Sequence, residues 1–371
     1  MHAHLKKVIK PSMFMAVIML FVANTSIAAQ QQFLIGTYTQ SDSEGVYKIT
    51  LDDEKQTLTN LGLVARATNP AYLSINSETK NMLAALENDS GGIASFMWNE
   101  ASKDYTMVQK IEDLGRHTCH ISTSPNNEKV AIANYSSGDI RVFSIDQQLM
   151  ALSQSAYFKN QGKGEHSRQE APHMHYVQWD KTGRFLYAVD LGTDEIKVFD
   201  SQNDAFDAQL AAKLDIGDGP RHIALHPNTN VVYSLNELSN TVTVFEQQAD
   251  TGKLLRLQKV NLLEDAEVEG NWASAIKVSA DGRYVYAAVR GVNKIAVLSA
   301  NTEGKLALVQ MHSTMGNWPR DIELSADGKY LLIANQKSGD ISVLARDEKS
   351  GMLSATKMQL ALSTPSYIGN L

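Results

Sequence analysis

The stretch from Gly219 to Phe245, GPRHIALHPNTNVVYSLNELSNTVTVF, decides the fold. It contains three apolar runs, Ile223–Leu225, Val231–Leu235 and Thr241–Phe245, the last alternating with threonine. The segments between the runs are rich in Pro, Asn and Ser, which favour turns because Pro restricts φ and Asn tolerates the left-handed region. The stretch therefore predicts three short antiparallel strands joined by two turns.

The same layout returns along the chain with different polar residues at the strand ends. Clear copies span His120–Phe143, His175–Phe199, Ser274–Leu298 and Arg320–Leu344, and a weaker copy begins at Ala71. Equivalent positions recur at a period of roughly fifty residues, at Cys119, His175, Arg221, Ser274 and Arg320. A repeat of this length, with three clear strands and a variable fourth, is typical of a β-propeller in which each repeat is one four-stranded blade.

The two ends of the chain supply what a further blade needs. Residues Phe33–Leu58 are similar to the later strands of a blade, and Pro365–Ile368 is similar to a first strand. We expect these segments to pair, because closing the ring removes the free sheet edges that would otherwise aggregate. The prediction is an all-β, seven-bladed propeller in which residues 30–371 form a single domain and the N- and C-terminal strands share one blade.

Composition narrows the class of protein and its partners. The chain has 371 residues with 43% hydrophobic and 20% charged side chains, which is typical of a globular protein. Its net charge is −7, and no basic block follows the N-terminus, so nucleic acid is not an expected partner. Cys119 is the one cysteine in the sequence, which excludes an intramolecular disulfide.

The N-terminus has the pattern of an export signal. Lys6, Lys7 and Lys10 precede the apolar run Met13–Val22, and small residues follow in Asn24–Ala29. This order predicts a signal peptide over residues 1–29, with an uncleaved membrane anchor as the alternative. We expect the mature chain to be periplasmic or secreted, without membrane contact after cleavage.

Polar residues at the strand ends are the candidate site. In a propeller, the start of each innermost strand and the end of the next strand lie at the same mouth of the central channel, because the two strands are antiparallel. Arg221, Arg290 and Arg320 would there bind an anionic, oxygen-rich small molecule and stabilise an oxyanion. A nearby histidine or Glu237 would act as the general acid or base.

Several of these residues also have structural interpretations. Asn236, like Asp190, can be a turn-capping residue, and His120 and His222 can be packed repeat residues. The segment His173-Met174-His175 could be a metal pair, but no third ligand is evident, so neither a metal nor another cofactor is expected.

The sequence pattern also gives an interpretation of the cysteine and of one connecting segment. Cys119 is a poor nucleophile candidate, because adjacent strand residues such as His120 point to opposite faces. The segment Ser153–Glu170 is interpreted as a solvated connection rather than as a loop covering the mouth of the channel.

The motifs PRHIALHPNTNVVYSLNELSNTVTVF, APHMHYVQWDKTGRFLYAVDLGTDEIKVF and WPRDIELSADGKYLLIANQKSGDISVL, with FLIGTYT near the start, resemble the lactonase family of seven-bladed propellers. This family includes the cycloisomerase-type 6-phosphogluconolactonases and the fungal carboxymuconate-lactonizing enzymes. The resemblance implies a metal-independent site at the channel mouth, formed by His173 or His175, Arg221, Glu237 and Arg290. The segment Asn271-Trp272-Ala273 departs from the family pattern, as does the expected export.

These observations predict hydrolysis of a sugar lactone to the aldonic acid, as in the 6-phosphogluconolactonases. The proposed catalytic residues are His173, His175, Arg221, Glu237 and Arg290. The residues expected to contact the substrate are His120, His222, Asn236 and Arg320. Two alternatives stay open: a non-catalytic propeller that binds a ligand or protein in the cell envelope, and a lactonizing isomerase acting on a dicarboxylate.

Overall fold

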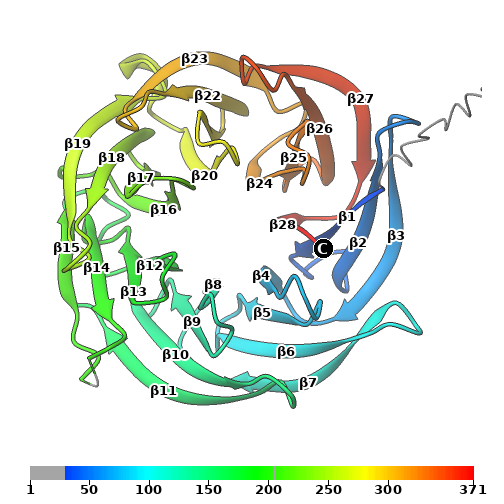
Figure 1. Cartoon of the computed structure of the whole chain (residues 1–371), viewed down its shortest axis with the longest axis horizontal. Helices are drawn as coiled ribbons and strands as arrows, with labels where there is room; N and C mark the ends of the chain where they lie inside the picture. Colours follow the sequence, from blue (N-terminus) through cyan, green and yellow to red (C-terminus); the bar gives the residue numbers. More distant parts are fainter. Residues whose placement is uncertain (1–29, 204) are drawn as a thin grey trace, which may run out of the picture.

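Seven four-stranded antiparallel sheets stand around a central channel (Figure 1). The computed structural model describes residues 30–203 and 205–371, so the predicted signal peptide lies outside the described residues. The innermost strands of the seven blades are β4 (Pro70–Ile75), β8 (Thr118–Thr123), β12 (Met174–Trp179), β16 (Pro220–Leu225), β20 (Trp272–Val278), β24 (Pro319–Leu324) and β28 (Pro365–Asn370). The seven-bladed all-β prediction is confirmed.

The other strands follow in order from the channel to the rim of each blade. The second strands are β5 (Met82–Leu86), β9 (Lys129–Asn134), β13 (Phe185–Asp190), β17 (Val231–Asn236), β21 (Tyr284–Arg290), β25 (Tyr330–Asn335) and β1 (Gln31–Thr37). The third strands are β6 (Gly92–Asn99), β10 (Asp139–Asp146), β14 (Glu195–Asp200), β18 (Thr241–Gln247), β22 (Lys294–Ala300), β26 (Asp340–Arg346) and β2 (Gly45–Asp52). The outer strands are β7 (Asp104–Glu112), β11 (Ala151–Lys159), β15 (Gln209–Lys213), β19 (Leu254–Asn261), β23 (Leu306–Ser313), β27 (Leu353–Ala361) and β3 (Thr57–Arg66).

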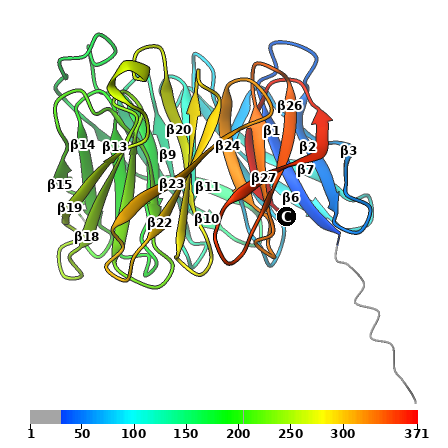
Figure 2. The same cartoon turned by 90° about the horizontal axis from the view of Figure 1, so that it is seen from above.

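We number the blades in chain order, so that β4–β7 form blade 1 and β28 with β1–β3 forms blade 7. Seen from the side, the strands run nearly along the channel, which gives a short cylinder (Figure 2). The only helix among the described residues is the 3-10 turn Asp265–Glu267. Within the part of the chain that the structure describes, no helix has the length and apolar character to span a membrane.

The burial of each strand matches its sequence pattern, from the strands near the channel to those at the rim. The second strands β13, β17 and β25 are buried along their whole length, which explains their continuous apolar runs. The outer strand β11 instead alternates buried or half-buried with exposed residues over most of its length, as expected for a strand with one solvated face. The apolar cores lie between adjacent blades, so each blade depends on its neighbours for burial.

A repeated tyrosine contact fixes neighbouring blades to each other. The hydroxyls of Tyr187, Tyr233 and Tyr286 donate hydrogen bonds of 2.7, 3.0 and 2.8 Å to the carbonyls of glycines in the next blade. These acceptors are Gly252, Gly304 and Gly351, all with φ between 67° and 76°. A Cβ at any of the three would lie within 2.8 Å of a neighbouring side chain, so only glycine permits this close approach.

The ring closes through the two ends of the chain, as predicted. Strand β1 pairs with β28, with Ile35 opposite Ile368 and Leu34 opposite Gly369. The last strand of the chain thereby becomes the innermost strand of blade 7, next to the first described strand (Figure 1). Without β28, blade 7 would have three strands and the edge of β1 would be unpaired.

Substitution of Ile368 tests the closure. Ile368 is 0% exposed and packs in the apolar cluster between blades 6 and 7. Ile368→Ala is expected to lower the free energy of unfolding by about 2–5 kcal/mol, because it removes buried methylenes and leaves a cavity. Urea denaturation followed by circular dichroism measures the change.

The matched control is Leu255→Ala on the outer strand β19, where the leucine is 54% exposed. This change is expected to stay within about 0.5 kcal/mol of the parent protein. An equal effect of the two substitutions would contradict the role of β28 in closing the ring.

Candidate active site

Each innermost strand carries a β-bulge close to the same mouth of the channel. The register of all seven inner pairs shifts at one place, where the inner strand has an extra residue. The residues at this position are Ala71, Cys119, His175, Arg221, Ser274, Arg320 and Ser366. A bulge redirects a side chain out of the regular alternation of the strand. We call these seven residues the bulge ring, and the end of the channel where they lie the mouth.

Several of the bulge residues connect one blade to the next. Ser274 Oγ donates to the carbonyl of Pro319 at 2.6 Å, and Ser366 Oγ donates to the carbonyl of Ala71 at 3.1 Å. Arg221 likewise donates from Nη1 to the carbonyl of Ser274. The ring therefore both lines the mouth and fixes its diameter.

A second ring comes from the residues at the ends of the second strands. In blade 4 the backbone N–H of Glu237 bonds to the carbonyl of Gly219 at 2.7 Å, and the equivalent bond recurs in other blades. The residues in this position are Tyr38, Glu87, Tyr135, Leu191, Glu237, Arg290 and Gln336. Of these, Glu237 and Arg290 were singled out from the sequence. Tyr38 and Glu87 were missed because they belong to the divided blade 7 and the weak blade 1.

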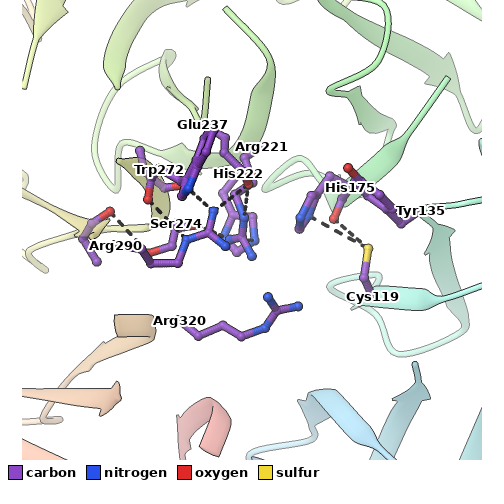
Figure 3. Close-up of polar contacts among 12 residues, drawn as sticks. Cys119, Tyr135, His175, Arg221, His222, Glu237, Trp272, Ser274, Arg290 and Arg320 are labelled. Carbon is purple, nitrogen blue, oxygen red and sulfur yellow. Dashed lines mark hydrogen bonds and ion pairs between the residues drawn. The ribbon is translucent and has the colours of Figure 1, made fainter. Parts of the chain in front are cut away.

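Glu237 is the centre of the charged cluster at the mouth. Its Oε2 lies 2.9 Å from Arg221 Nε and 2.8 Å from Arg290 Nη2, and its Oε1 lies 2.6 Å from Arg168 Nη1. Its side chain is only 2% exposed. Burial alone would raise the pKa of this carboxyl, but the three guanidiniums outweigh burial and lower the pKa. Figure 3 shows Glu237 facing Arg221 and Arg290.

The two strand-borne arginines are held by the backbone as well as by Glu237. Arg290 donates from Nε to the Trp272 carbonyl at 3.2 Å and from Nη2 to the Ala273 carbonyl at 3.1 Å. Arg221 Nε is buried and lies near the carboxylate without hydrogen-bond geometry. Burial lowers the pKa of Arg290 to about 10 despite the nearby carboxylate. These guanidiniums are strongly desolvated cations.

His175 faces the mouth from the bulge of blade 3. Its Nδ1 lies 3.9 Å from Cys119 Sγ, and its ring meets those of Tyr135 and His222 edge-on at 5.4 and 5.6 Å. Burial and the charge of Arg221 lower the pKa of His175 well below its usual value, so the imidazole is neutral at neutral pH.

Cys119 sits beside this imidazole but is not activated by it. Burial, with a smaller contribution from Glu87, raises the pKa of the Cys119 thiol, which keeps it protonated. The thiol hydrogen bonds to the carbonyl of His175 at 3.4 Å. This environment agrees with the expectation that Cys119 is a poor nucleophile.

His173 takes a different position from His175. Its ring stacks on Tyr135 with centroids 4.4 Å apart and planes 13° apart, and its Nδ1 lies 3.1 Å from the Tyr135 carbonyl oxygen. Its Nε2 lies 3.3 Å from the exposed carboxylate of Glu170. Of the two histidines in the His-x-His segment, His175 is therefore the one that belongs to the bulge ring, whereas His173 is stacked on Tyr135.

His120 and His222 belong to an aromatic layer at the next channel-facing positions of their strands. The ring of His120 lies 3.7 Å from that of Tyr176 and 4.1 Å from that of Tyr72, and His222 lies 4.5 Å from Tyr176. Burial lowers the pKa of both histidines. His222 Nε2 accepts a hydrogen bond of 2.8 Å from Arg221 Nη1, so it positions that arginine.

The side chain of Asn236 forms its hydrogen bonds within its own blade. Its Nδ2 donates to Thr241 Oγ1 at 2.8 Å and to Thr243 Oγ1 at 2.9 Å, and its Oδ1 accepts from Ser234 at 3.1 Å. The side chain is fully buried. The turn-capping interpretation fits these bonds, and no polar atom of this amide is left for a substrate.

Arg320 forms a second charged group across the mouth. Its Nη2 lies 3.2 Å from Glu87 Oε2, which also accepts a 2.6 Å hydrogen bond from the hydroxyl of Tyr38. Figure 3 shows Arg320 facing the same opening as His175 and Arg221. Four guanidiniums thus lie beside two carboxylates, those of buried Glu237 and half-buried Glu87, with the exposed Glu170 as a third nearby. The mouth has an excess of positive charge that suits an anionic ligand.

The connection between blades 2 and 3 is largely exposed, in line with our interpretation of its sequence, but two of its residues are buried and one reaches the mouth. Gln169 is fully buried and donates from Nε2 to the carbonyl of Leu191 at 2.8 Å and to Asp194 Oδ1 at 2.7 Å. The neighbouring Arg168 reaches Glu237 and lies 5.1 Å from the ring of Trp272. The sequence did not indicate these contacts, because a loop has no periodic pattern that shows which of its residues are buried.

The described residues contain no group of three or more His, Cys, Asp or Glu side chains placed to hold a metal ion. A cleft of about 620 Å³ lies at the other end of the channel, between blades 5 and 6. Its charged residues form local pairs, such as Lys277 with Glu323 at 2.6 Å and Arg283 with Asp281 at 2.7 Å. The unbalanced positive charge of the mouth makes the mouth the stronger candidate site.

Comparison with known proteins identifies the family to which this fold belongs. The family described as "Lactonase, 7-bladed beta-propeller" matches residues 32–369. The 6-phosphogluconolactonase of Bacillus subtilis (strain 168) is 35% identical over 282 residues, which cover 76% of this chain and 81% of the relative. The chain therefore belongs to the lactonase family of seven-bladed β-propellers.

Solved structures of similar proteins have the same architecture. The periplasmic gluconolactonase of Pseudomonas aeruginosa aligns with a TM-score of 0.87 at 27% identity, covering 92% of this chain and 99% of that protein. A protein from Lactobacillus plantarum aligns with a TM-score of 0.86 at 29% identity, covering 92% and 100% of the two chains.

Neutralising Glu237 tests the charged cluster. Glu237→Gln is expected to lower the free energy of unfolding at pH 7 by about 3–5 kcal/mol, because it leaves buried guanidiniums without their carboxylate. The difference should shrink below about pH 4.3, where the unfolded glutamate takes up a proton while the folded one stays ionised. Urea denaturation between about pH 3 and pH 7 measures it.

Glu303→Gln is the matched control, since Glu303 pairs with Lys305 at 2.9 Å on the exposed surface. Its effect is expected to stay within about 0.5 kcal/mol at neutral pH. A stability difference for Glu237→Gln that stayed constant down to pH 3 would show that the folded carboxyl has an ordinary pKa.

Proposed function

We propose that the protein hydrolyses a sugar lactone to the aldonic acid at the mouth of the channel. The proposal rests on one observation. A neutral, buried histidine, His175, lies at the same mouth as the desolvated guanidiniums of Arg221 and Arg290, which flank Glu237. Membership of the lactonase family and the 6-phosphogluconolactonase relative support the same reaction class.

The first step is attack of water on the lactone carbonyl. Neutral His175 takes a proton from the water, which forms a bond to the carbonyl carbon and leaves the carbonyl oxygen negatively charged. Arg221 and Arg290 stabilise this oxyanion from fixed positions, so little reorganisation is needed. The proposal gives the electrophilic role to arginine rather than to a metal ion.

In the second step the bond between the carbonyl carbon and the ring oxygen breaks. The imidazolium of His175 returns its proton to the departing ring oxygen, and the products are a hydroxyl and a carboxylic acid, which releases its proton to the solvent and becomes a carboxylate. Glu237 holds the two arginines in place, and its negative charge stabilises the imidazolium between the steps. Arg320, across the mouth, would bind a polar or anionic end of the substrate.

The proposed location is the periplasm or the outside of the cell. The export pattern in residues 1–29 supports it, as does the similarity to a periplasmic gluconolactonase. An exported enzyme meets sugar lactones formed outside the cytoplasm, so an unphosphorylated lactone is a natural candidate substrate. Residues 30–371 act in this proposal as one domain.

Substitution of His175 tests the proton-transfer role. His175→Gln is expected to lower kcat for hydrolysis of glucono-δ-lactone or 6-phosphogluconolactone by roughly 10²–10⁴-fold, the usual contribution of a general base. A pH-stat assay, corrected for spontaneous hydrolysis, measures the rate. His312→Gln, on the outer strand β23, is the matched control and should leave kcat unchanged.

His173→Gln separates the two histidines of the segment and should affect kcat less than His175→Gln, because the ring of His173 is stacked on Tyr135. Lactone binding by the parent protein without acid release would contradict hydrolysis and favour a binding protein. Lactone formation from a muconate-type dicarboxylate, without sugar-lactone hydrolysis, would favour the isomerase alternative.

The pH dependence of kcat/KM provides an independent check. Because burial and Arg221 lower the pKa of His175, the neutral imidazole persists well below pH 6.5, the ordinary histidine value. Hydrolysis is therefore expected to hold its rate as the pH falls from about 7.5 to 6. A loss of activity centred near pH 6.5 would assign the base to an unperturbed histidine instead.

A further inference from the structure

Residues 160–172, which we call the strap, join blade 2 to blade 3 and are anchored near both ends. At the start, Asn160 Nδ2 donates to Asp190 Oδ2 at 2.6 Å. Towards the end, the buried Gln169 binds the carbonyl of Leu191 and the carboxylate of Asp194. These anchors fix the backbone on either side of Arg168, which projects from the strap to the mouth.

Arg168 contacts three other parts of the ring. Its Nη1 lies 2.6 Å from Glu237 Oε1 in blade 4, and its Nη2 lies 3.3 Å from the hydroxyl of Tyr135 in blade 2. Its guanidinium lies 5.1 Å from the ring of Trp272 in blade 5, within the range of a cation–π contact. Trp272 lies in the segment Asn271-Trp272-Ala273, by which we expect this chain to depart from the family pattern.

Arg168 differs from the other two arginines around Glu237 in how it is held. Arg221 and Arg290 lie on strands, bond to backbone carbonyls and have side chains only 3% and 7% exposed. Arg168 lies on a loop, its side-chain partners are other side chains, and it is 37% exposed. It is the one guanidinium of the cluster that can exchange its partner without disturbing a strand.

We propose that Arg168 is the substrate-selecting residue of this site: it leaves Glu237 to bind a phosphate or carboxylate group on the lactone, and Trp272 supports it in both positions. A guanidinium binds either group through paired hydrogen bonds, as it binds a carboxylate here. The inference rests on the proposed lactonase function and refines its substrate: among unphosphorylated lactones it favours those that carry a carboxylate, and the phosphorylated lactone serves as a second anionic probe.

When Arg168 binds a substrate anion, Glu237 loses one of its three guanidinium partners. Its Oε1 loses its salt-bridge partner, while Oε2 keeps Arg221 and Arg290. The groups that face the carboxylate are then these two arginines and His175. The two strand-borne arginines therefore hold the carboxylate in place when Arg168 moves, and loss of Arg168 leaves the rest of the cluster paired.

The test compares Arg168→Gln and Arg168→Lys on a charged and an uncharged substrate, 6-phosphogluconolactone and glucono-δ-lactone. Arg168→Gln is expected to raise KM for the phosphorylated lactone roughly ten- to hundredfold, the range for losing a charged hydrogen-bond pair. KM and kcat for the plain lactone should change by less than about threefold. Arg168→Lys should restore part of the affinity, because it keeps the charge but not the paired geometry.

Arg256→Gln is the matched control. Arg256 is 38% exposed and pairs with Asp215 at 2.7 Å on the outer surface, so its loss should change neither substrate's kinetics. Equal losses on both lactones in Arg168→Gln would overturn the inference and give Arg168 a purely structural role. Unchanged kinetics on both lactones would overturn it as well.

A binding measurement separates this inference from the proposed reaction. If the parent protein hydrolyses neither lactone, the hydrolase proposal fails, and calorimetric titration with 6-phosphogluconate tests Arg168 alone. At least tenfold weaker binding to Arg168→Gln than to the parent protein and to Arg256→Gln would support the anion site. Equal affinity for all three proteins, or absence of binding to the parent, would overturn it.

Discussion

The pairing of the first and last strands of the chain holds the site together. Strand β28 brings the C-terminal end to the channel beside β1, and this contact completes the ring of seven inner strands. Each inner strand then contributes one bulge residue to the mouth, and several of these residues bond to the next blade. The positions of the functional groups therefore depend on a closed ring, since an open one would leave both edges free to move or aggregate.

Charge imbalance at the mouth is the property from which function follows. Burying an arginine is costly, and the structure offsets that cost only in part, because two carboxylates face four guanidiniums. The remaining positive charge favours an anionic substrate or a developing oxyanion. Burial, with the charge of Arg221, keeps His175 neutral, and the guanidiniums keep Glu237 ionised, so the same site supports both proton transfer and anion stabilisation.

Much of this arrangement can be predicted from the repeats. Aligning the turns placed five bulge residues in equivalent positions, and the structure puts all five at the mouth. Ala71 and Ser366 were not assigned because they are small and lie in the weak and the divided blades. Glu87 was not assigned because it lies in the weak blade. The sequence did not distinguish His175 from His173, because a bulge and a stacking tyrosine separate them.

By itself, the sequence determined the blades, the closure of the ring and the residue types at the strand ends, since strand period and turn chemistry are local and repeat along the chain. Only the tertiary structure decided which of those residues meet. It placed His120 and His222 in the packed aromatic layer, and it brought Arg168 to Glu237, 69 residues further along the chain. A contact over that distance depends on the ring geometry and on an anchored loop, which no local pattern encodes.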